Sequence, residues 1–331
     1  MDQESLLAAA EFVPRQLVFP SSWCGHLPFA AWLMQQLRPA CFVELGTHTG
    51  NSYLTFCQTA VGGTRCFAVD TWRGDAHAGF YGGEVFDQLR AYHDPRYGGF
   101  STLLRATFDE AVSRFDDQSI GLLHIDGLHT YEAVAHDFAT WLPKLVPSAV
   151  VLLHDTQVRE NDFGVWKLFE ELCVQNPFHL EFKQSFGLGV LQLAGGTPLD
   201  WLQPAAPERA QVGKYFTALG LAMMARYLAE EQTALMAQLR TELARYHDRT
   251  VQQDATITAQ AATLADCEAR LLEQQQKLTA GAEQLAAKQQ VLVQLRAEHD
   301  EARARLTALL QSKSWRLTAP LRVISRHVTG S

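Results

Sequence analysis

Two residue types become scarce in the last third of this 331-residue sequence. All 18 phenylalanines lie at or before Phe216, and after Pro207 the only proline is Pro320. A segment without phenylalanine lacks a major builder of aromatic cores, and one nearly without proline has few enforced turns. The chain as a whole is 47% hydrophobic, which suffices for a substantial core. The sequence therefore predicts two parts that are built differently rather than one fold.

Other absences exclude whole classes of protein. No apolar run reaches the roughly 18–20 residues that a membrane span needs. The N-terminus, Met1-Asp2-Gln3-Glu4, is acidic and therefore unlike a signal peptide. The formal net charge is −8, which argues against a nucleic-acid partner. We therefore expect a cytoplasmic protein.

The six cysteines show neither a CxxC pair nor the spacing of a zinc site. Most of them lie inside apolar runs, where a reduced cysteine behaves as a small hydrophobic residue. This usage favours a reducing compartment over a disulfide framework. The cysteines are Cys24, Cys41, Cys57, Cys66, Cys173 and Cys267.

Short β-rich runs alternate with amphipathic segments between positions 41 and 193. The segment 131–142, for example, places Val134, Phe138 and Trp141 at helical spacing. Strands separated by helices predict a parallel sheet covered on both faces, whereas a short connection at 185–187 suits an antiparallel hairpin. We therefore predict an α/β fold, a Rossmann-like, doubly wound sheet with a terminal antiparallel strand. The expected strands are 41–44, 65–70, 120–126, 149–154, 180–183 and 189–193.

A glycine-bearing turn follows the first expected strand. Gly46 and Gly50 are four residues apart, so the pattern is not GxGxxG, and without a following lysine it is not a P-loop. Glycine lets the backbone approach a ligand closely, and Glu44 favours a cationic or hydroxyl-rich ligand over a pyrophosphate. Asp70 ends the next strand, about 20 residues on, where nucleotide-type folds hold ribose hydroxyls. The alternative role for Asp70 is a helix N-cap.

Several stretches, in a fixed order, carry a resemblance to a known family. They are Trp23 to Phe29, VELGTHTGNSYLTFC (43–57), AVDTWRGDAHAGFYG (68–82), LLHIDGLHTYEAVAHDF (122–138), VLLHDTQVRENDFGVW (151–166) and FGLGVL (186–191). Together they resemble the class I S-adenosylmethionine-dependent methyltransferases, in particular the sugar and polysaccharide O-methyltransferases related to macrocin- and cephalosporin-type enzymes. The resemblance implies S-adenosylmethionine as the cofactor. The cofactor-binding residues that it implies are Glu44, Gly46, Thr47, Gly50, Asn51 and Ser52 in the first loop, Asp70 at the ribose, and Trp72 and Thr107 near the adenine.

Acidic and imidazole side chains follow two neighbouring strands. Asp126 and His129 stand at the end of one strand, and His154 and Asp155 at the end of the next. Since adjacent parallel strands end at one edge, Asp126, His154 and Asp155 are predicted to share a divalent cation such as Mg²⁺, which the resemblance also implies. His129 is our candidate general base, with Asp126 as the alternative because Leu128 stands where the macrocin-type pattern has a second carboxylate. Ordinary capping or orienting roles are the alternative for both histidines.

Apolar residues recur every seven positions in the last third. They are Ile257, Leu264, Leu271, Leu278, Leu285 and Leu292, after an earlier run of Leu221, Leu228 and Leu235 in another phase. Such a stripe predicts a coiled coil over 218–310, and with it a homo-oligomer. Shorter helices that fold back as a bundle are the alternative.

The final segment, 311–331, contains no acidic residue. Basic residues such as Arg316 and Arg322 alternate there with apolar ones such as Trp315 and Leu321. A basic amphipathic segment can lie in a membrane interface, and the alternatives are a surface for a partner enzyme or a frayed tail. We therefore divide the chain into a methyltransferase domain (1–195), a linker (196–217), a coiled coil (218–310) and a basic amphipathic tail (311–331).

The resemblance also predicts a reaction. It implies metal-assisted methylation of a sugar hydroxyl in the assembly of a bacterial surface polysaccharide such as O-antigen or capsule. The string from Ser314 to Arg322 is similar to tails of bacterial glycan-building enzymes, which suggests such enzymes as partners at the inner face of the cell membrane. The alternatives are O-methylation of a small secondary metabolite, and a non-catalytic scaffold that retains a spent methyltransferase fold.

Overall fold

The structure, a computed structural model, describes residues 3–268 and 275–311. The chain divides into two units, Met1–Met224 and Ala225–Ser331. The predicted basic tail, 311–331, lies outside the described residues apart from position 311, and so does Leu271 of the heptad stripe. In the part of the chain that is described, no helix is both long and apolar enough to cross a bilayer.

The first unit is built on a seven-stranded sheet with the strand order β5-β2-β1-β6-β7-β9-β8. Strands β5, β2, β1, β6 and β7 pair in parallel, whereas β9 runs antiparallel to both β7 and β8. This arrangement confirms the predicted fold class, a doubly wound sheet with an antiparallel strand. The strands are β1 (Cys41–Leu45), β2 (Arg65–Asp70), β5 (Ser101–Arg105), β6 (Ile120–Ile125), β7 (Leu145–His154), β8 (His179–Phe182) and β9 (Leu188–Gln192).

Two features of the strands differ from the expected set. Strand β5 is an edge strand whose residues are mostly half-exposed or exposed, so its sequence, STLLR, lacks the apolar run of the central strands. A separate two-stranded hairpin, β3 (Gly74–Asp75) and β4 (Gly79–Phe80), lies in the region that sequence analysis leaves without regular structure.

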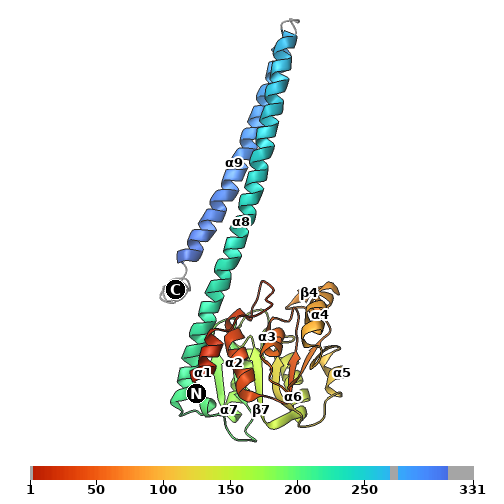
Figure 1. The fold of residues 1–331 in the computed structure, drawn as a ribbon, viewed down its shortest axis with the longest axis vertical. Helices are drawn as coiled ribbons and strands as arrows, with labels where there is room; N and C mark the ends of the chain where they lie inside the picture. The colour runs from red at the N-terminus through yellow and green to blue at the C-terminus, as the bar shows by residue number, and fades with distance from the viewer. Residues whose placement is uncertain (1–2, 269–274, 312–331) are drawn as a thin grey trace. The chain divides into compact units, whose positions relative to one another are not determined.

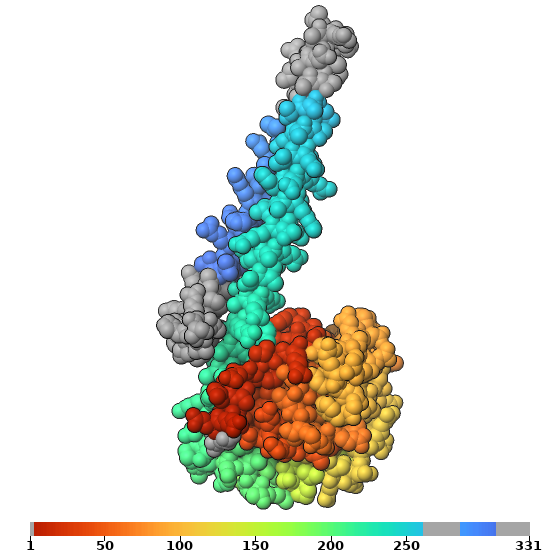
Figure 2. Space-filling model, in the orientation of Figure 1, coloured from red at the N-terminus to blue at the C-terminus, as the bar shows by residue number. Residues whose placement is uncertain are grey.

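Helices cover the sheet on both faces (Figure 1). On one side α2 packs against α1 and α3, and on the other α6 packs against both α5 and α7. Figure 2 shows the N-terminal segment, in red, at the surface of the first unit beside the orange segment that includes α4. The helices are α1 (Gln3–Ala10), α2 (Leu27–Leu37), α3 (Asn51–Thr59), α4 (Glu84–Tyr97), α5 (Phe108–Val112), α6 (Tyr131–Trp141) and α7 (Val165–Gln175).

The alternation of side chains along β1 separates the two layers. Val43 and Leu45 belong to the core cluster that includes residues of α5, α6 and α7. Phe42 faces the other way and packs its ring 4.4 Å from that of Phe56 in α3. Because side chains alternate with a period of two, Glu44 lies on the Phe42 side, beneath the N-terminal helices. Glu44 therefore faces away from the core cluster that includes α5, α6 and α7.

Two long helices follow the sheet, α8 (Pro207–Glu268) and α9 (Gln275–Gln311). The start of α8 belongs to the first unit, where Phe216 is buried with its ring 5.0 Å from that of Trp32. Helix α8 therefore extends into positions 207–217, which sequence analysis assigns to a linker. Proline is tolerated at the first position of a helix, so Pro207 starts α8 instead of preventing it.

Candidate functional site

The glycine turn after β1 brings two strand ends into close contact. Gly46 has φ 86°, a left-handed value, and a Cβ there would collide with the main-chain oxygen of Asp126. Its N–H donates to the carbonyl of Val69, and Leu45 accepts from the N–H of Asp126. Glycine is therefore required at this position, both for its backbone conformation and because no side chain fits between β1 and β6.

Asp70, at the end of β2, holds the same turn in shape. Its Oδ2 accepts hydrogen bonds from the main-chain N–H groups of Thr47 and His48, both 2.9 Å long, and its Oδ1 accepts one from the N–H of Trp72 at 2.6 Å. A carboxylate has about four acceptor positions, so one remains for a ligand. Asp70 lies at the wall of the pocket described next.

A pocket of about 280 Å³ opens at the carboxyl ends of β1, β2 and β6. Its described lining includes three aspartates and two histidines and no lysine or arginine, so its electrostatic character favours a cationic or neutral ligand. The lining residues are Gly46, His48, Asp70, Thr71, Gly74, Asp75, Ala78, Tyr81, Thr107, Phe108, Asp126, Gly127, Leu128 and His129.

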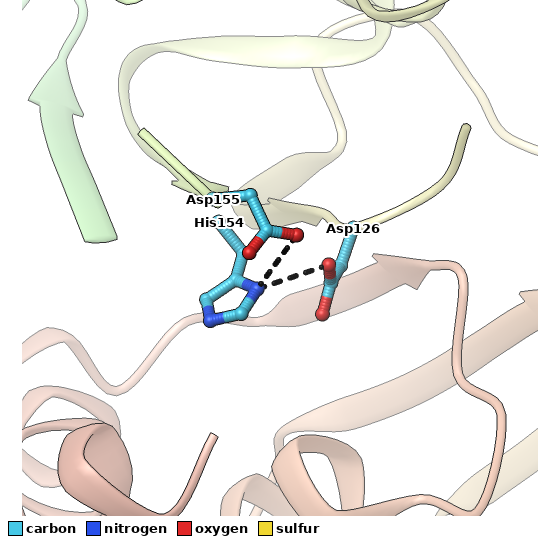
Figure 3. Close-up of side chains that lie close together, drawn as sticks. All are labelled: Asp126, His154 and Asp155. Carbon is cyan, nitrogen blue, oxygen red and sulfur yellow. Dashed lines mark hydrogen bonds and ion pairs between the residues drawn. The ribbon is translucent and has the colours of Figure 1, made fainter. Parts of the chain in front are cut away.

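Four polar side chains meet beside this pocket at the ends of β6 and β7. The Nε2 atom of His129 lies 2.9 Å from Asp155 Oδ2 and 3.4 Å from Asp126 Oδ1. The Nδ1 atom of His154 lies 3.2 Å from Asp126 Oδ1 and 3.3 Å from Asp155 Oδ2. Figure 3 shows the side chains of Asp126, His154 and Asp155 pointing toward one another. The arrangement alternates two carboxylates with two imidazoles.

The charges in this cluster depend strongly on one another. Burial alone would lower the pKa of His129, but hydrogen bonds with Asp126 and Asp155 outweigh it and raise the pKa to about 9. Burial likewise opposes the charged form of His154, yet the two carboxylates raise its pKa well above the usual value. The pKa of Asp126 is lowered in turn, because the attraction of His154 and His129 exceeds the cost of burial. Without another cation, the imidazoles supply the positive charge.

The donor pattern of His154 fits a divalent cation at this point. Its Nε2 lies 3.0 Å from the main-chain oxygen of Ser185, which can only accept, so Nε2 carries a hydrogen. Nδ1, facing the two carboxylates, then either holds a second proton or offers its lone pair toward a cation. One ligand atom from each of Asp126, His154 and Asp155 lies within 4.8 Å of the others. Carboxylate and imidazole donors of this kind suit Mg²⁺, Mn²⁺ or a similar ion.

Asp155 adopts a backbone conformation that its position enforces. Its φ is 64°, in the left-handed region, and its N–H donates to the carbonyl of Gly187 at 3.0 Å. Ser185 and Phe186, in the turn between β8 and β9, also have positive φ values, of 48° and 67°. Unfavourable conformations in non-glycine residues cost about 1–3 kcal/mol each and gather at functional sites. The turn thus directs the Asp155 carboxylate into the cluster.

Aromatic rings from two loops stack over His129. The ring of Phe163 is 4.6 Å from that of His129 with an angle of 6° between the planes, and 4.4 Å from that of His77. His77 belongs to the β3–β4 hairpin, where its N–H donates to Asp75 Oδ1 at 2.7 Å. The hairpin and the loop before α7 therefore place two flat rings against the ring of His129.

Only some of the predicted site residues lie at the pocket or in the four-residue cluster. It places Gly46, Asp70, Thr107, Asp126 and His129 on the pocket wall, and His154 and Asp155 next to Asp126. The other predicted residues do not appear in the described lining.

Several of these remaining side chains have other partners. The carboxamide of Asn51 makes two hydrogen bonds of 2.8 Å with the main chain of Val18. Glu44 is fully buried against His124, with Oε2 2.8 Å from Nδ1, and Trp72 is buried with its indole N–H bonded to the carbonyl of His48. Thr47 and Ser52 are also buried, and Gly50 is the left-handed N-cap of α3. Thr107 caps α5.

Sequence reasoning gave no site role to two contributors, His48 and Trp23. His48 and Tyr81 line the pocket with their rings 4.8 Å apart, and Trp23 donates its indole N–H to Asp126 Oδ2 at 3.1 Å. Tyr81 lies in the segment 74–100, whose glycine, tyrosine, histidine and acidic residues indicate a loop over the site and make Tyr81 a candidate for contact with a sugar. Trp23 is separated from Asp126 by more than a hundred residues, so no spacing pattern could connect them.

Residues 43–156 match the model of a protein family described as a methyltransferase domain. The match begins in β1 and ends just after Asp155, so it spans the glycine turn, the pocket and the four-residue cluster. This part of the chain is therefore similar to a methyltransferase domain, and the sheet that contains it has a Rossmann-like, doubly wound strand order.

Particular relatives extend the comparison. A curated protein of Sinorhizobium fredii, described as the uncharacterized protein y4gI, is 52% identical over 174 residues. The match covers 52% of this chain and 19% of that protein, so the chain spans about a fifth of its length. Among solved structures, the O-methyltransferase TomG of Streptomyces achromogenes, in complex with SAM, is 13% identical with a TM-score of 0.41, covering 59% of this chain and 92% of its own. An O-methyltransferase of Bacillus cereus, in complex with SAH, is 17% identical with a TM-score of 0.40, covering 58% and 92%.

Proposed function

We propose that the chain is an S-adenosylmethionine-dependent, divalent-metal-assisted O-methyltransferase that acts on a sugar hydroxyl. The observation that carries this proposal is the meeting of Asp126, His129, His154 and Asp155 beside a pocket formed by the glycine turn. A methyltransferase domain with carboxylates and an imidazole at its acceptor side has the groups needed to bind a hydroxyl and remove its proton.

The pocket chemistry supports S-adenosylmethionine as the methyl donor. Asp70, Asp75 and Asp126 line the pocket and no lysine or arginine accompanies them in its described lining, so a sulfonium and a ribose suit it better than a phosphate. When bound, the cofactor supplies an electrophilic methyl group. Gly46 leaves room for it, Asp70 offers its remaining acceptor position to hydroxyls, and Thr107 and Phe108 form a wall.

The metal ligands that we propose are Asp126, His154 and Asp155. A bound cation would polarise the acceptor hydroxyl and lower its pKa. It would also pair with the carboxylates of Asp126 and Asp155, which pair with His129 in this structure. His129 is the group that we propose as the general base, because its Nε2 faces the cluster and the residue lines the pocket.

A sugar acceptor is supported by the sequence resemblance and by the surroundings of His129. The rings of His77 and Phe163 lie beside His129 and are of the flat kind that packs against the C–H face of a sugar, while Asp75 on the pocket wall offers an acceptor for its hydroxyls. The role that we propose for the whole protein is in bacterial surface-polysaccharide assembly, such as O-antigen or capsule, at the cytoplasmic face of the membrane.

The second unit supports a proposal about assembly. Helices α8 and α9 leave large apolar side chains exposed, among them Leu243 at 63% and Leu285 at 65%. Apolar residues on long helices are covered when the helices associate, so we propose that positions 218–310 form a coiled coil that makes the protein a homo-oligomer. The tail, 311–331, is proposed to contact the membrane surface or a glycan-assembly enzyme.

The experiment that tests the proposal is methyl transfer from labelled S-adenosylmethionine to nucleotide sugars and glycan acceptors, with and without EDTA. We expect EDTA to abolish transfer, Mn²⁺ or Mg²⁺ to restore it, and Asp155→Ala to lower kcat/KM by about a hundredfold or more. Asp109→Ala is the matched control, because Asp109 is an exposed carboxylate paired with His136. Full activity in EDTA would refute the metal, and transfer only to a non-sugar phenol or antibiotic would refute the sugar acceptor.

A further inference from the structure

The two oxygens of the Asp126 carboxylate face different surroundings. Oδ1 faces the cluster, 3.2 Å from His154 Nδ1 and 3.4 Å from His129 Nε2. Oδ2 faces the protein interior, where it accepts the indole N–H of Trp23 at 3.1 Å and lies 4.0 Å from His124 Nε2. One oxygen is therefore available to a metal or substrate, and the other is held from behind.

We propose that Trp23 is a positioning residue that fixes the Asp126 carboxylate so that Oδ1 alone is presented to the metal and to His129. This inference rests on the proposed function, because it assigns the metal-binding carboxylate its orientation. Trp23 is not part of the described pocket lining, and it reaches the predicted metal ligand Asp126 through a hydrogen bond to Oδ2.

The indole of Trp23 is held in place on several sides. Trp23 is 3% exposed, and its ring lies 4.7 Å from that of His124 and 5.5 Å from that of His154, stacked on the latter with 29° between the planes. Edge contacts with His26 and Phe56 complete its surroundings. Close packing on several sides restrains the ring and with it the direction of its N–H.

The segment that follows Trp23 is anchored to the same turn that supports His154. Gly25 donates its N–H to Ser185 Oγ at 2.9 Å, and His26 Nε2 lies 3.2 Å from the Ser185 carbonyl. That carbonyl also accepts from His154 Nε2. Ser185 therefore fixes the positions of Trp23 and His154 together, and both of these contact Asp126.

Strand pairing determines where His124, the other neighbour of Asp126 Oδ2, lies. Glu44 and His124 are directly opposite each other in the β1–β6 register, and Glu44 Oε2 lies 2.8 Å from His124 Nδ1. Because alternate residues share a face, His124 and Asp126 project to the same side, where Trp23 covers them. His124 Nε2 is buried with no hydrogen-bond partner among the described residues, so Trp23 supplies the hydrogen bond to Oδ2.

A neutral donor suits this position for an electrostatic reason. An indole N–H orients a carboxylate without cancelling its charge, whereas a lysine or arginine would neutralise it and compete with a cation. Groups that orient a metal ligand from behind typically change metal affinity by about 10- to 100-fold when they are removed. Trp23→Phe removes the donor and keeps an aromatic ring in the packing, so it isolates the hydrogen bond.

The experiment compares Trp23→Phe with Trp32→Phe in the full chain. Trp32 is an equally buried tryptophan whose indole N–H donates to Ser5 Oγ and not to the site. Mn²⁺ affinity is measured from the free-ion electron paramagnetic resonance signal, and S-adenosylmethionine affinity by calorimetry. We expect Trp23→Phe to weaken Mn²⁺ binding by about 10-fold or more with cofactor affinity within about twofold of wild type. Trp32→Phe should change neither affinity.

Two results would overturn the proposal. One is Mn²⁺ binding by Trp23→Phe as tight as that of the wild type. The other is a parallel loss of cofactor binding in that variant, since the role of Trp23 would then be structural.

A second measurement is independent of the metal. In an indole-selective ¹H–¹⁵N spectrum, Asp126→Ala should move the Trp23 Nε1–H signal and leave that of Trp32 in place, and an unmoved Trp23 signal refutes the contact. If the wild-type chain binds no Mn²⁺, the metal part of the proposed function fails, and this spectrum decides the Trp23–Asp126 contact by itself.

Discussion

His129 Nε2 and Asp155 Oδ2 lie 2.9 Å apart, although the two residues come from the ends of different strands. The contact ties the proposed base to a proposed metal ligand. Whatever cation binds Asp155 therefore changes the electrostatic environment of His129 directly. Acid–base chemistry and metal binding are therefore expected to depend on each other at this site.

Removal of the His129 imidazole should impair catalysis more than binding. We expect His129→Ala to lower kcat by about 10²- to 10⁴-fold, the usual contribution of a positioned base, with little change in S-adenosylmethionine affinity. Steady-state kinetics and calorimetry measure the two effects. His136→Ala is the control, because His136 is an exposed histidine of α6 that pairs with Asp109. A His129→Ala variant with wild-type kcat would remove the base assignment.

The glycine turn should tolerate no side chain at Gly46. A Cβ would collide with the Asp126 carbonyl and would impose a left-handed backbone on alanine, so we expect Gly46→Ala to lose at least roughly 1–3 kcal/mol of unfolding free energy and its cofactor binding. Gly62→Ala is the matched control, since a Cβ there meets nothing within 4 Å. Chemical denaturation and calorimetry test both. Wild-type cofactor affinity in Gly46→Ala would contradict the placement of the pocket.

Asp137 should make the stability of the domain depend on pH. Burial in α6 raises the pKa of Asp137 to about 7, with smaller effects from His136 and Asp109. The folded state therefore binds this proton more tightly than the unfolded state. The stability that the protonated group contributes is complete below about pH 4 and is lost as the pH rises to about 7.

Asp137→Asn should remove that dependence. Relative to the variant, the wild type should lose on the order of 2–4 kcal/mol between pH 4 and pH 7, measured by urea denaturation at each pH. Parallel curves for the two proteins across this range would show that Asp137 titrates normally.

Two glycines of α8 should respond oppositely to alanine. At Gly213 a new Cβ meets only Leu180 Cδ1, at 3.5 Å, so Gly213→Ala should stabilise by about 0.5–1 kcal/mol, as alanine does within helices. At Gly220 the Cβ would collide with the carbonyl of Gly25, so Gly220→Ala should destabilise the first unit. Thermal unfolding distinguishes them. Equal stabilisation by both variants would mean that α8 does not pack closely on the Gly25 segment.

The predictable parts of the fold and site depend on local patterns. Apolar runs mark the central strands, and because parallel strands end at one edge, the sequence alone groups Asp126, His154 and Asp155. Strand β5 could not be predicted in this way, because it lies at the edge of the sheet and its residues are mostly half-exposed or exposed.

Other features depend on tertiary contacts that no spacing encodes. Asn51 bonds to Val18, Trp72 turns into the core beside Phe86, and Trp23 reaches Asp126 across the fold. Each of these side chains could serve a ligand or the protein equally well. Whether such a side chain binds a ligand or another part of the protein depends on which groups the folded helices and sheet place next to it.

Calorimetric titration of S-adenosylmethionine into the wild-type chain tests the central claim most directly. We expect about one cofactor to bind per chain, with binding lost in Gly46→Ala and retained in Gly62→Ala. Absence of binding in the wild type at millimolar cofactor, with the domain folded, would contradict it and would favour a scaffold that retains the methyltransferase fold without its activity.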